Sequence, residues 1–323
     1  MRRLMGLVVS LTLLGLLYAF VDVGALAKAI RSSEPGWLIA GVALVIPLTA
    51  LTAWRFSLLV RDAKIGFGEA NQLTLAASTL NLFLPSKMGD LAKAVVLTDR
   101  HGLNANLALS ITVLEKALDM LSLLIWGVAA MLYVGIFDPV VLLLAVPVIG
   151  LLMVVAAMVL PLSLTNRAIA FACRHLPAGL ANRIEHFWKT LSDVVAWFWS
   201  RPLWALGIFG LSLILWLTHL WQFWFFTKSV GGSMPLIDNM AFATLSILIG
   251  LLPFTVAGIG SRDAAIVFFY GAYLSPAAAA FVGILATLRY IVPAIAGLPF
   301  VGVFTAAFSE WRRTGEVKCA KEA

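Results

Sequence analysis

Two stretches of sequence interrupt apolar runs and decide the architecture: N-L-F-L-P-S-K-M-G-D at residues 81–90 and L-P-F-T-V-A-G-I-G-S-R-D at residues 252–263. Proline removes a backbone donor and glycine loosens the backbone, so a continuous helix is disfavoured in both. The apolar runs 73–96 and 236–270 are thereby divided into halves of about 15 residues or fewer, about 22 Å of helix, too short to cross about 30 Å of hydrocarbon. We therefore expect two re-entrant helical hairpins, with two proline-kinked spans as the alternative. The residues at the breaks are Pro85, Gly89, Pro253, Gly258 and Gly260.

The two stretches also resemble copies of each other. Matching residues keep nearly constant separations of 167 to 173 positions, and the four pairs are Trp54 with Trp221, Pro85 with Pro253, Asp90 with Asp263, and Lys116 with Arg289. Three full crossings would lie between the copies, and an odd number turns the second copy upside down. Inverted repeats with discontinuous helices are the architecture of secondary transporters. The sequence thus predicts repeat 1 at about 37–135 and repeat 2 at about 203–308.

Composition indicates an integral membrane protein. Of the 323 residues, 62% are hydrophobic and 12% are charged, with a mean hydropathy of +0.98. One water-soluble core cannot absorb this much apolar surface, so lipid must solvate the excess. Besides the two hairpins, six runs have the length of a transmembrane helix: 4–20, 37–60, 105–135, 139–162, 203–227 and 276–308. We expect an all-α polytopic fold forming a single membrane domain.

Basic residues predict the orientation, because Lys and Arg accumulate on the cytoplasmic side. That side would hold Arg2, Arg3, Arg61, Lys64, Lys93, Arg100, Arg167, Arg174, Arg183, Lys189, Arg201, Arg312, Arg313, Lys318 and Lys321. The loops outside keep only Lys28, Arg31 and Lys228. Both termini, including the tail 309–323, would be cytoplasmic in a bacterial-type inner membrane. We interpret run 4–20 as an uncleaved signal-anchor, with a cleaved signal peptide as the alternative.

Aromatic and basic residues alternate through residues 165–201, which Pro177 and Gly179 divide. This pattern is typical of two amphipathic helices lying on the inner leaflet. The segment would be either a platform for lipid headgroups or a plain connector.

A few charges fall inside the apolar segments, where charges usually line a cavity and have partners. Glu115, Lys116 and Asp119 lie on one predicted helix, and Arg289 lies near the middle of another. At the hairpins the charged residues are Lys87, Asp90, Arg262 and Asp263. We expect these eight residues to form a substrate site in which the cations hold a phosphate and the carboxylates hold the cations or relay protons. In the alternative, the two aspartates cap helices and the other charges form structural ion pairs.

The sequence predicts no cofactor and no metal site, because Cys173, Cys319 and the four histidines lack ligand spacing. Nucleic-acid binding is excluded because no basic face accompanies a soluble domain. The predicted partner is a membrane lipid. A homodimer is compatible with the sequence, although no pattern calls for one.

Three motifs resemble those of the flippase-like membrane domain of lysylphosphatidylglycerol synthases and its stand-alone relatives. They are N-x-x-x-P-x-K-x-G-D at 81–90, E-K-x-x-D at 115–119 and L-P-x-T-x-x-G-x-G-x-R-D at 252–263. Asp90 and Asp263 replace an expected Glu and Lys116 an expected Arg, which keeps the charge but alters reach and geometry. The resemblance implies lipid translocation without the soluble aminoacyl-transfer domain. The implied cargoes are aminoacylated or anionic phospholipids, polyprenyl-phosphate-linked sugars and isoprenoid-derived lipids.

Three functions are therefore in competition. A lipid flippase accounts for broken helices and inward charges together. A membrane enzyme could use Glu115, Asp119 and Asp90 as a carboxylate site, although no nucleotide loop or catalytic triad accompanies them. An accessory protein would have no need of inward charges. The sequence favours the flippase and predicts no catalytic residues.

Overall fold

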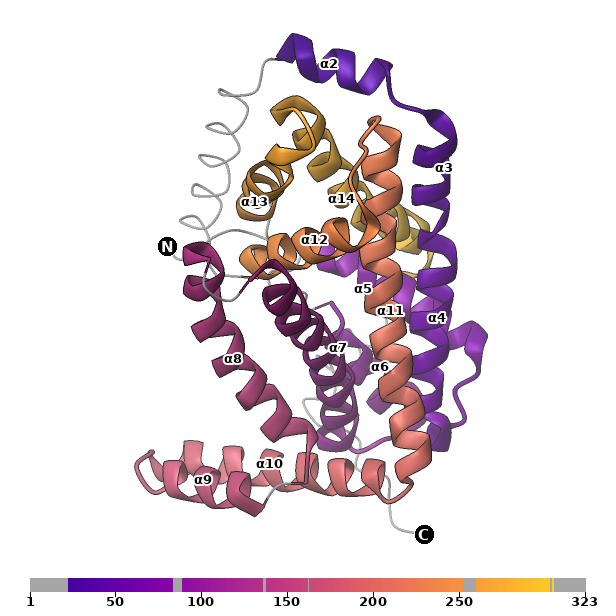
Figure 1. The fold of residues 1–323 in the computed structure, drawn as a ribbon. Helices are drawn as coiled ribbons and strands as arrows, with labels where there is room; N and C mark the ends of the chain where they lie inside the picture. The colour runs from indigo at the N-terminus through magenta and orange to yellow at the C-terminus, as the bar shows by residue number, and fades with distance from the viewer. Residues whose placement is uncertain are drawn as a thin grey trace.

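The computed structural model describes residues 23–83, 89–135, 138–161, 163–251, 260–302 and 304, and the regular elements within them are all helical (Figure 1). The α-helices are α2 (Val23–Arg31), α3 (Pro35–Ala43), α4 (Val45–Leu59), α5 (Phe67–Phe83), α6 (Ala92–His101), α7 (Ala105–Val134), α8 (Pro139–Val159), α9 (Ser163–Cys173), α10 (Ala178–Trp199), α11 (Pro202–Ser229), α12 (Leu236–Gly250), α13 (Ser261–Phe269) and α14 (Pro276–Gly297). Short 3₁₀ turns are η1 (Arg61–Ala63), η4 (Tyr270–Ala272) and η5 (Leu298–Phe300).

Five segments of the described chain are long and apolar enough to cross a membrane: Pro35–Leu59, Ala105–Val134, Pro139–Val159, Pro202–Ser229 and Pro276–Phe300. They coincide with five of the six predicted runs, and the sixth, 4–20, lies outside the described residues. The prediction of an all-α membrane protein is confirmed, whereas a sixth span stays a prediction.

Surface composition agrees with lipid as the solvent. On α8, large apolar side chains such as Leu143, Val146 and Met153 are mostly exposed. Polar and charged side chains are instead buried between helices, including Arg55 and Glu115. An apolar exterior around a partly polar interior is what a bilayer requires.

Both predicted breaks lie between two short helices, α5 and α6 in one case and α12 and α13 in the other. Gly89 precedes α6 and lies directly against α5, where a Cβ would approach the Ala77 carbonyl oxygen to 2.5 Å. Gly260 precedes α13 with φ of 96°, a conformation that favours glycine. The breaks at Pro85, Pro253 and Gly258 lie outside the described residues, so the re-entrant path stays a prediction.

The helices of the two predicted repeats pack reciprocally. α5 packs along α14, where Thr79 donates to the Ala294 carbonyl at 2.6 Å, and α12 packs along α7. α6 lies against α7 as α13 lies against α14, and α4 lies against α5 as α11 lies against α12. Each half thus supplies a broken helix to the other half, as a duplication would produce. The inverted repeat itself stays a prediction.

Most of residues 165–201 lie in α9 and α10, which extend across one end of the bundle, at the lower ends of α7, α8 and α11 in Figure 1. The inner face of α10 contacts α7, and Trp199 donates to the Val159 carbonyl at 2.7 Å. Arg167, Arg174, Arg183 and Lys189 are exposed. Two amphipathic helices were expected here, and their position on a membrane surface stays a prediction.

Candidate functional site

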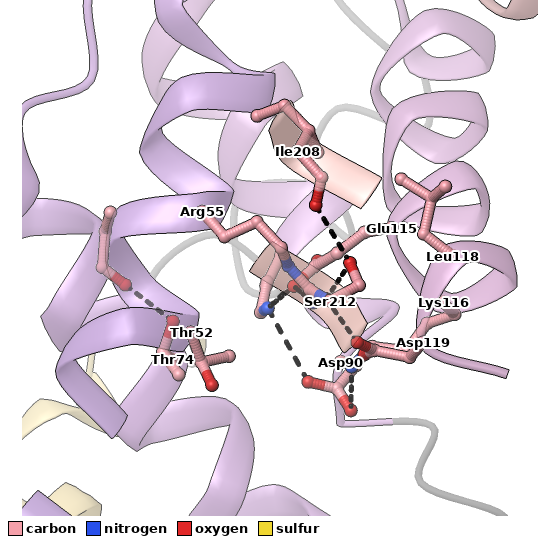
Figure 2. A network of polar contacts seen from close by, with 12 residues as sticks. Thr52, Arg55, Thr74, Asp90, Glu115, Lys116, Leu118, Asp119, Ile208 and Ser212 are labelled. Atoms are coloured by element: carbon pink, nitrogen blue, oxygen red, sulfur yellow. Dashed lines mark hydrogen bonds and ion pairs between the residues drawn. The ribbon is translucent and has the colours of Figure 1, made fainter. Parts of the chain in front are cut away.

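A network of buried charges joins α4, α6 and α7 (Figure 2). Glu115 on α7 is fully buried, and its carboxylate oxygens accept hydrogen bonds from Lys93 at 3.1 and 3.2 Å. The guanidinium of Arg55 lies 3.5 Å from Glu115 on its other side. Burying a lone carboxylate in a membrane protein is costly, so these two cations are what allow Glu115 to occupy the core.

Asp119 lies one helical turn beyond Glu115 and faces the same cations. Arg55 donates to Asp119 and also to the Ser212 hydroxyl on α11, at 2.7 Å for the serine (Figure 2). Lys116 lies 3.2 Å from Asp119. Glu115 and Asp119 were predicted to share one face of a helix, and this face of α7 contacts Arg55.

Asp90 connects the break between α5 and α6 to this network. It forms ion pairs with Lys116 at 3.1 Å and with Lys93 at 3.6 Å, and it accepts a hydrogen bond from Asn81 at 3.1 Å. The capping position of α6 is Leu91 and carries no side-chain cap. The helix-capping alternative is therefore wrong for Asp90, because its oxygens are directed at ammonium groups instead.

This network is electrically balanced. Three cations, Arg55, Lys93 and Lys116, face three carboxylates, Asp90, Glu115 and Asp119. Five of the six side chains are at most 25% exposed, and the Lys116 side chain, which lines the central cavity, is 33% exposed. A balanced and hydrogen-bonded set is the form in which charges persist at membrane depth.

Arg262 and Asp263 form a second, smaller group at the start of α13. Arg262 donates to Asp263 at 2.7 Å and to the Thr287 hydroxyl on α14 at 2.6 Å. The other Asp263 oxygen accepts from the Gly260 amide at 3.1 Å, which satisfies a free donor at the helix start. For Asp263 the capping alternative is correct, and the same side chain also holds Arg262.

Arg289 on α14 differs from all of these cations. It is 95% buried, yet no described carboxylate lies within ion-pair distance of it. It donates to the Tyr290 hydroxyl at 2.6 Å, its Nη1 lies 3.4 Å from Nδ1 of His219, and its Nε has no hydrogen-bond partner among the described residues. The rings of Phe223 and Tyr290 lie 5.1 and 4.7 Å from the guanidinium carbon. Aromatic faces stabilise a cation but do not neutralise it.

Both charge groups and Arg289 meet at one internal cavity of about 250 Å³. It lies between α4, α5, α7, α11, α13 and α14, so each predicted repeat contributes to its wall. Among the described residues, its charged lining consists of Asp90, Lys116, Asp119, Arg262 and Arg289. The remaining polar lining includes Thr49, Thr52, Thr74, Ser78, Asn81, His219, Gln222, Thr287 and Tyr290. A cavity that combines these charged and polar groups with apolar side chains is suited to the headgroup of a lipid.

Seven of the eight predicted site residues lie at or directly behind this cavity. Glu115 and Asp263 lie behind the cavity wall. Asp263 pairs with Arg262, which lines the cavity, and Glu115 pairs with Arg55 of the adjoining charge network. The eighth, Lys87, lies outside the described residues. The structure brings the predicted charges together, and their role in binding stays a prediction.

Two charged residues of the site, Lys93 and Arg55, are not among those predicted from the sequence. Lys93 was expected on the cytoplasmic side but is fully buried between Glu115 and the ring of Phe56, 4.4 Å from its centroid. Its spacing of three residues from Asp90, at the predicted start of a helix, was the available signal. Arg55 was not assigned to the site, although it interrupts an apolar run just as Arg289 does. The same reasoning applied to both would have found it.

The described residues contain no group of three or more side chains suited to a metal ion. The model of the lysylphosphatidylglycerol synthase transmembrane-region family matches residues 3–297, almost the whole chain. The chain belongs to this family. A search of curated proteins found no match. Membership in the family, together with five apolar candidate spans, establishes a membrane-embedded protein whose function concerns membrane lipids.

Proposed function

We propose that this family member translocates a lipid with a phosphate-bearing or aminoacylated headgroup through the cavity between its two broken helix pairs. The observation that carries the proposal is Arg289, a buried cation that faces a polar cavity without a described carboxylate partner. An isolated buried charge is costly, and an anionic ligand would compensate it.

Charge balance favours a headgroup with one negative charge. Within the described residues, five cations at or behind the cavity face four carboxylates, which leaves one positive charge in excess. A phosphodiester carries one negative charge, and Arg binds phosphate through paired N–H donors. The partly accessible carboxylate of Asp119 would accept an ammonium group if the headgroup is aminoacylated.

Alternating access would follow from the two broken helix pairs. Discontinuous helices that meet near the bilayer midplane are a recurring way to build a substrate site in transporters. The reciprocal packing of α5 on α14 and α12 on α7 supports such an arrangement. In this scheme the two halves rock about the cavity and expose it to one leaflet at a time.

We place the α9–α10 end in the cytoplasm of a bacterial-type inner membrane, with both termini on that side. The support is the distribution of basic residues. Exposed cations gather at that end, namely Arg61, Lys64, Arg100, Arg167, Arg174, Arg183, Lys189 and Arg201. At the opposite end of the described chain are Lys28, Arg31 and Lys228. This asymmetry follows the positive-inside pattern.

The enzyme alternative gains no support from the geometry. Glu115, one of its proposed acid–base groups, does not line the cavity and is engaged by Arg55 and Lys93. Asp119 is likewise paired with Arg55 and Lys116. Carboxylates held this way orient cations, and we therefore propose a transporter rather than an enzyme.

Reconstitution in liposomes tests the proposal. Fluorescent phosphatidylglycerol in the outer leaflet is quenched with dithionite, and its transbilayer movement is measured with and without protein. We expect movement above protein-free vesicles, reduced at least tenfold in Arg289→Ala and partly restored in Arg289→Lys. A tenfold loss corresponds to about 1.4 kcal/mol of binding.

The matched control is Arg61→Ala, because Arg61 is an exposed arginine that forms a surface ion pair with its neighbour Asp62. Its lipid movement should equal that of the wild-type protein. Wild-type movement in Arg289→Ala, or no movement by the wild-type protein of any phospholipid tested, would overturn the proposal.

A further inference from the structure

His219 contacts Arg289 at the wall of the cavity. Nη1 of Arg289 lies 3.4 Å from Nδ1 of His219, and both side chains line the cavity. A guanidinium has only donors, so the imidazole nitrogen must accept. Nδ1 of His219 therefore carries no proton in this arrangement, and the imidazole is neutral.

The charged surroundings of His219 come from several helices. Among the described residues that line the cavity with His219, α14 contributes Arg289 and Tyr290, α7 contributes Lys116 and Asp119, α13 contributes Arg262, and Asp90 precedes α6. From α4, Arg55 contacts α11 at Ser212. The carboxylates among these are each paired with a cation within 4 Å. The guanidinium of Arg289 is in direct hydrogen-bond contact with Nδ1, and it opposes a second positive charge beside it.

We infer that binding of a phosphate oxyanion at Arg289 is coupled to protonation of His219. An oxyanion on the guanidinium takes the N–H donors that now point at the imidazole. Nδ1 then loses its donor and stands beside a negative charge, so it takes up one proton from water and donates the new N–H to the same oxyanion. This inference rests on the proposed function and names its energy coupling: a monoanionic headgroup would cross together with one proton, without net charge.

The sign of the pH dependence follows from linkage. Because the bound state holds one proton more than the free state, affinity for the oxyanion must rise as pH falls. Each unit of rising pH within the coupled range weakens binding by up to tenfold. Imidazole ordinarily titrates near pH 6.5, so the range to examine runs from about pH 5.5 to about pH 8.

Calorimetry on the purified full chain in detergent tests the coupling. The probe is dihexanoyl phosphatidylglycerol, titrated at several pH values in two buffers of different ionisation enthalpy, which counts the protons exchanged. We expect uptake approaching one proton per lipid near the middle of the range and affinity at least fivefold higher at pH 6 than at pH 7.5. Glycerophosphoglycerol, the same phosphodiester without acyl chains, shows whether the oxyanion alone suffices; proton uptake with either probe supports the coupling.

His219→Gln removes the titratable group while keeping a polar side chain. Its affinity should no longer vary with pH, and its proton uptake should fall to zero. His186→Gln, an exposed histidine on α10, should retain the wild-type pH dependence. Lipid binding by the wild-type protein without proton uptake would overturn the coupling even if His219→Gln failed to fold, and would leave the proposed function intact. Failure of the wild-type protein to bind either probe would overturn both.

Discussion

Lys116 and Arg289 hold matching positions in the two predicted repeats, 173 residues apart, yet their surroundings differ. Lys116 lies between Asp90 and Asp119 and belongs to a set of charges that sums to zero. Arg289 lies at the same cavity beside Tyr290, His219 and Phe223, and no described carboxylate neutralises it.

The difference lies in what surrounds the shared position. In repeat 1, Glu115 precedes Lys116 and Asp119 follows it by three residues, whereas in repeat 2 the corresponding residues are Leu288 and Val292. Asp119, which pairs with Lys116, thus has an apolar counterpart, and Asp263, the counterpart of Asp90, pairs with Arg262 instead of Arg289. One half of the described chain thus holds a balanced ion network, and the other holds a buried cation without a described carboxylate partner. In the proposed function, this second cation is the one that binds the headgroup.

The largest expected effect comes from unbalancing the network. Glu115→Gln leaves Arg55 and Lys93 fully buried with one carboxylate fewer, and removing one partner of a buried ion pair typically costs about 3–5 kcal/mol. We expect a marked fall in melting temperature and in the yield of monodisperse protein in detergent, measured by fluorescence-detected size exclusion during heating.

Two controls make that result interpretable. Glu69→Gln removes a carboxylate from the partly exposed pair with His101, and its cost should be about 1 kcal/mol or less. Arg289→Leu removes a cation that has no described ion-pair partner, so it should also change the melting temperature far less than Glu115→Gln. Equal destabilisation by Glu115→Gln and Arg289→Leu would remove the distinction between the two regions.

The second prediction concerns a substitution that makes repeat 2 resemble repeat 1. Val292→Asp places a carboxylate three residues after Arg289, the spacing that joins Lys116 to Asp119. The new carboxylate should compete with the lipid for the guanidinium and slow lipid movement in liposomes at least tenfold, about 1.4 kcal/mol. Val292→Asn, of nearly the same shape but uncharged, should keep most of the activity. Equal activity of the two variants would mean that Arg289 does not bind the anionic headgroup.

The smallest effect concerns a carboxylate at the surface. Hydrogen bonds from Tyr133 at 2.6 Å and Tyr273 at 2.5 Å lower the pKa of Asp238 below its ordinary value. A lowered pKa in the folded state contributes stability that is present at neutral pH and is lost as pH falls through that pKa. Asp238→Asn should therefore lower the melting temperature at pH 7 by no more than about 2 °C, and by less near pH 4. A fall in melting temperature as large as that of Glu115→Gln would contradict the view that burial of a carboxylate decides how much its removal destabilises the protein.

Much of the fold could be predicted, because bilayer thickness imposes a length on every apolar run. Runs 105–135 and 139–162 match α7 and α8 closely, and Pro139 and Pro276 begin helices as expected from the missing amide. Helix capping by Asp90, the alternative interpretation, is not observed, because its side chain pairs with Lys93 on α6 and Lys116 on α7. Positive charge in the sequence likewise misplaced Lys93, since a basic residue near an apolar run is usually a topological signal.

The sequence by itself determined that this protein lies in a membrane, that its fold is all-helical, and where its two helix breaks fall. It also identified seven of the charged residues at the cavity. These features can be predicted because hydropathy, proline and rare intramembrane charges act locally along the chain. Only the tertiary structure decided which charge neutralises which. Arg55 reaches Asp119 across 64 residues, Lys93 reaches Glu115 across 22, and Arg289 meets His219 across 70. Electrostatic pairing depends on distance in space, and that distance is set by how α4, α6, α7, α11 and α14 pack.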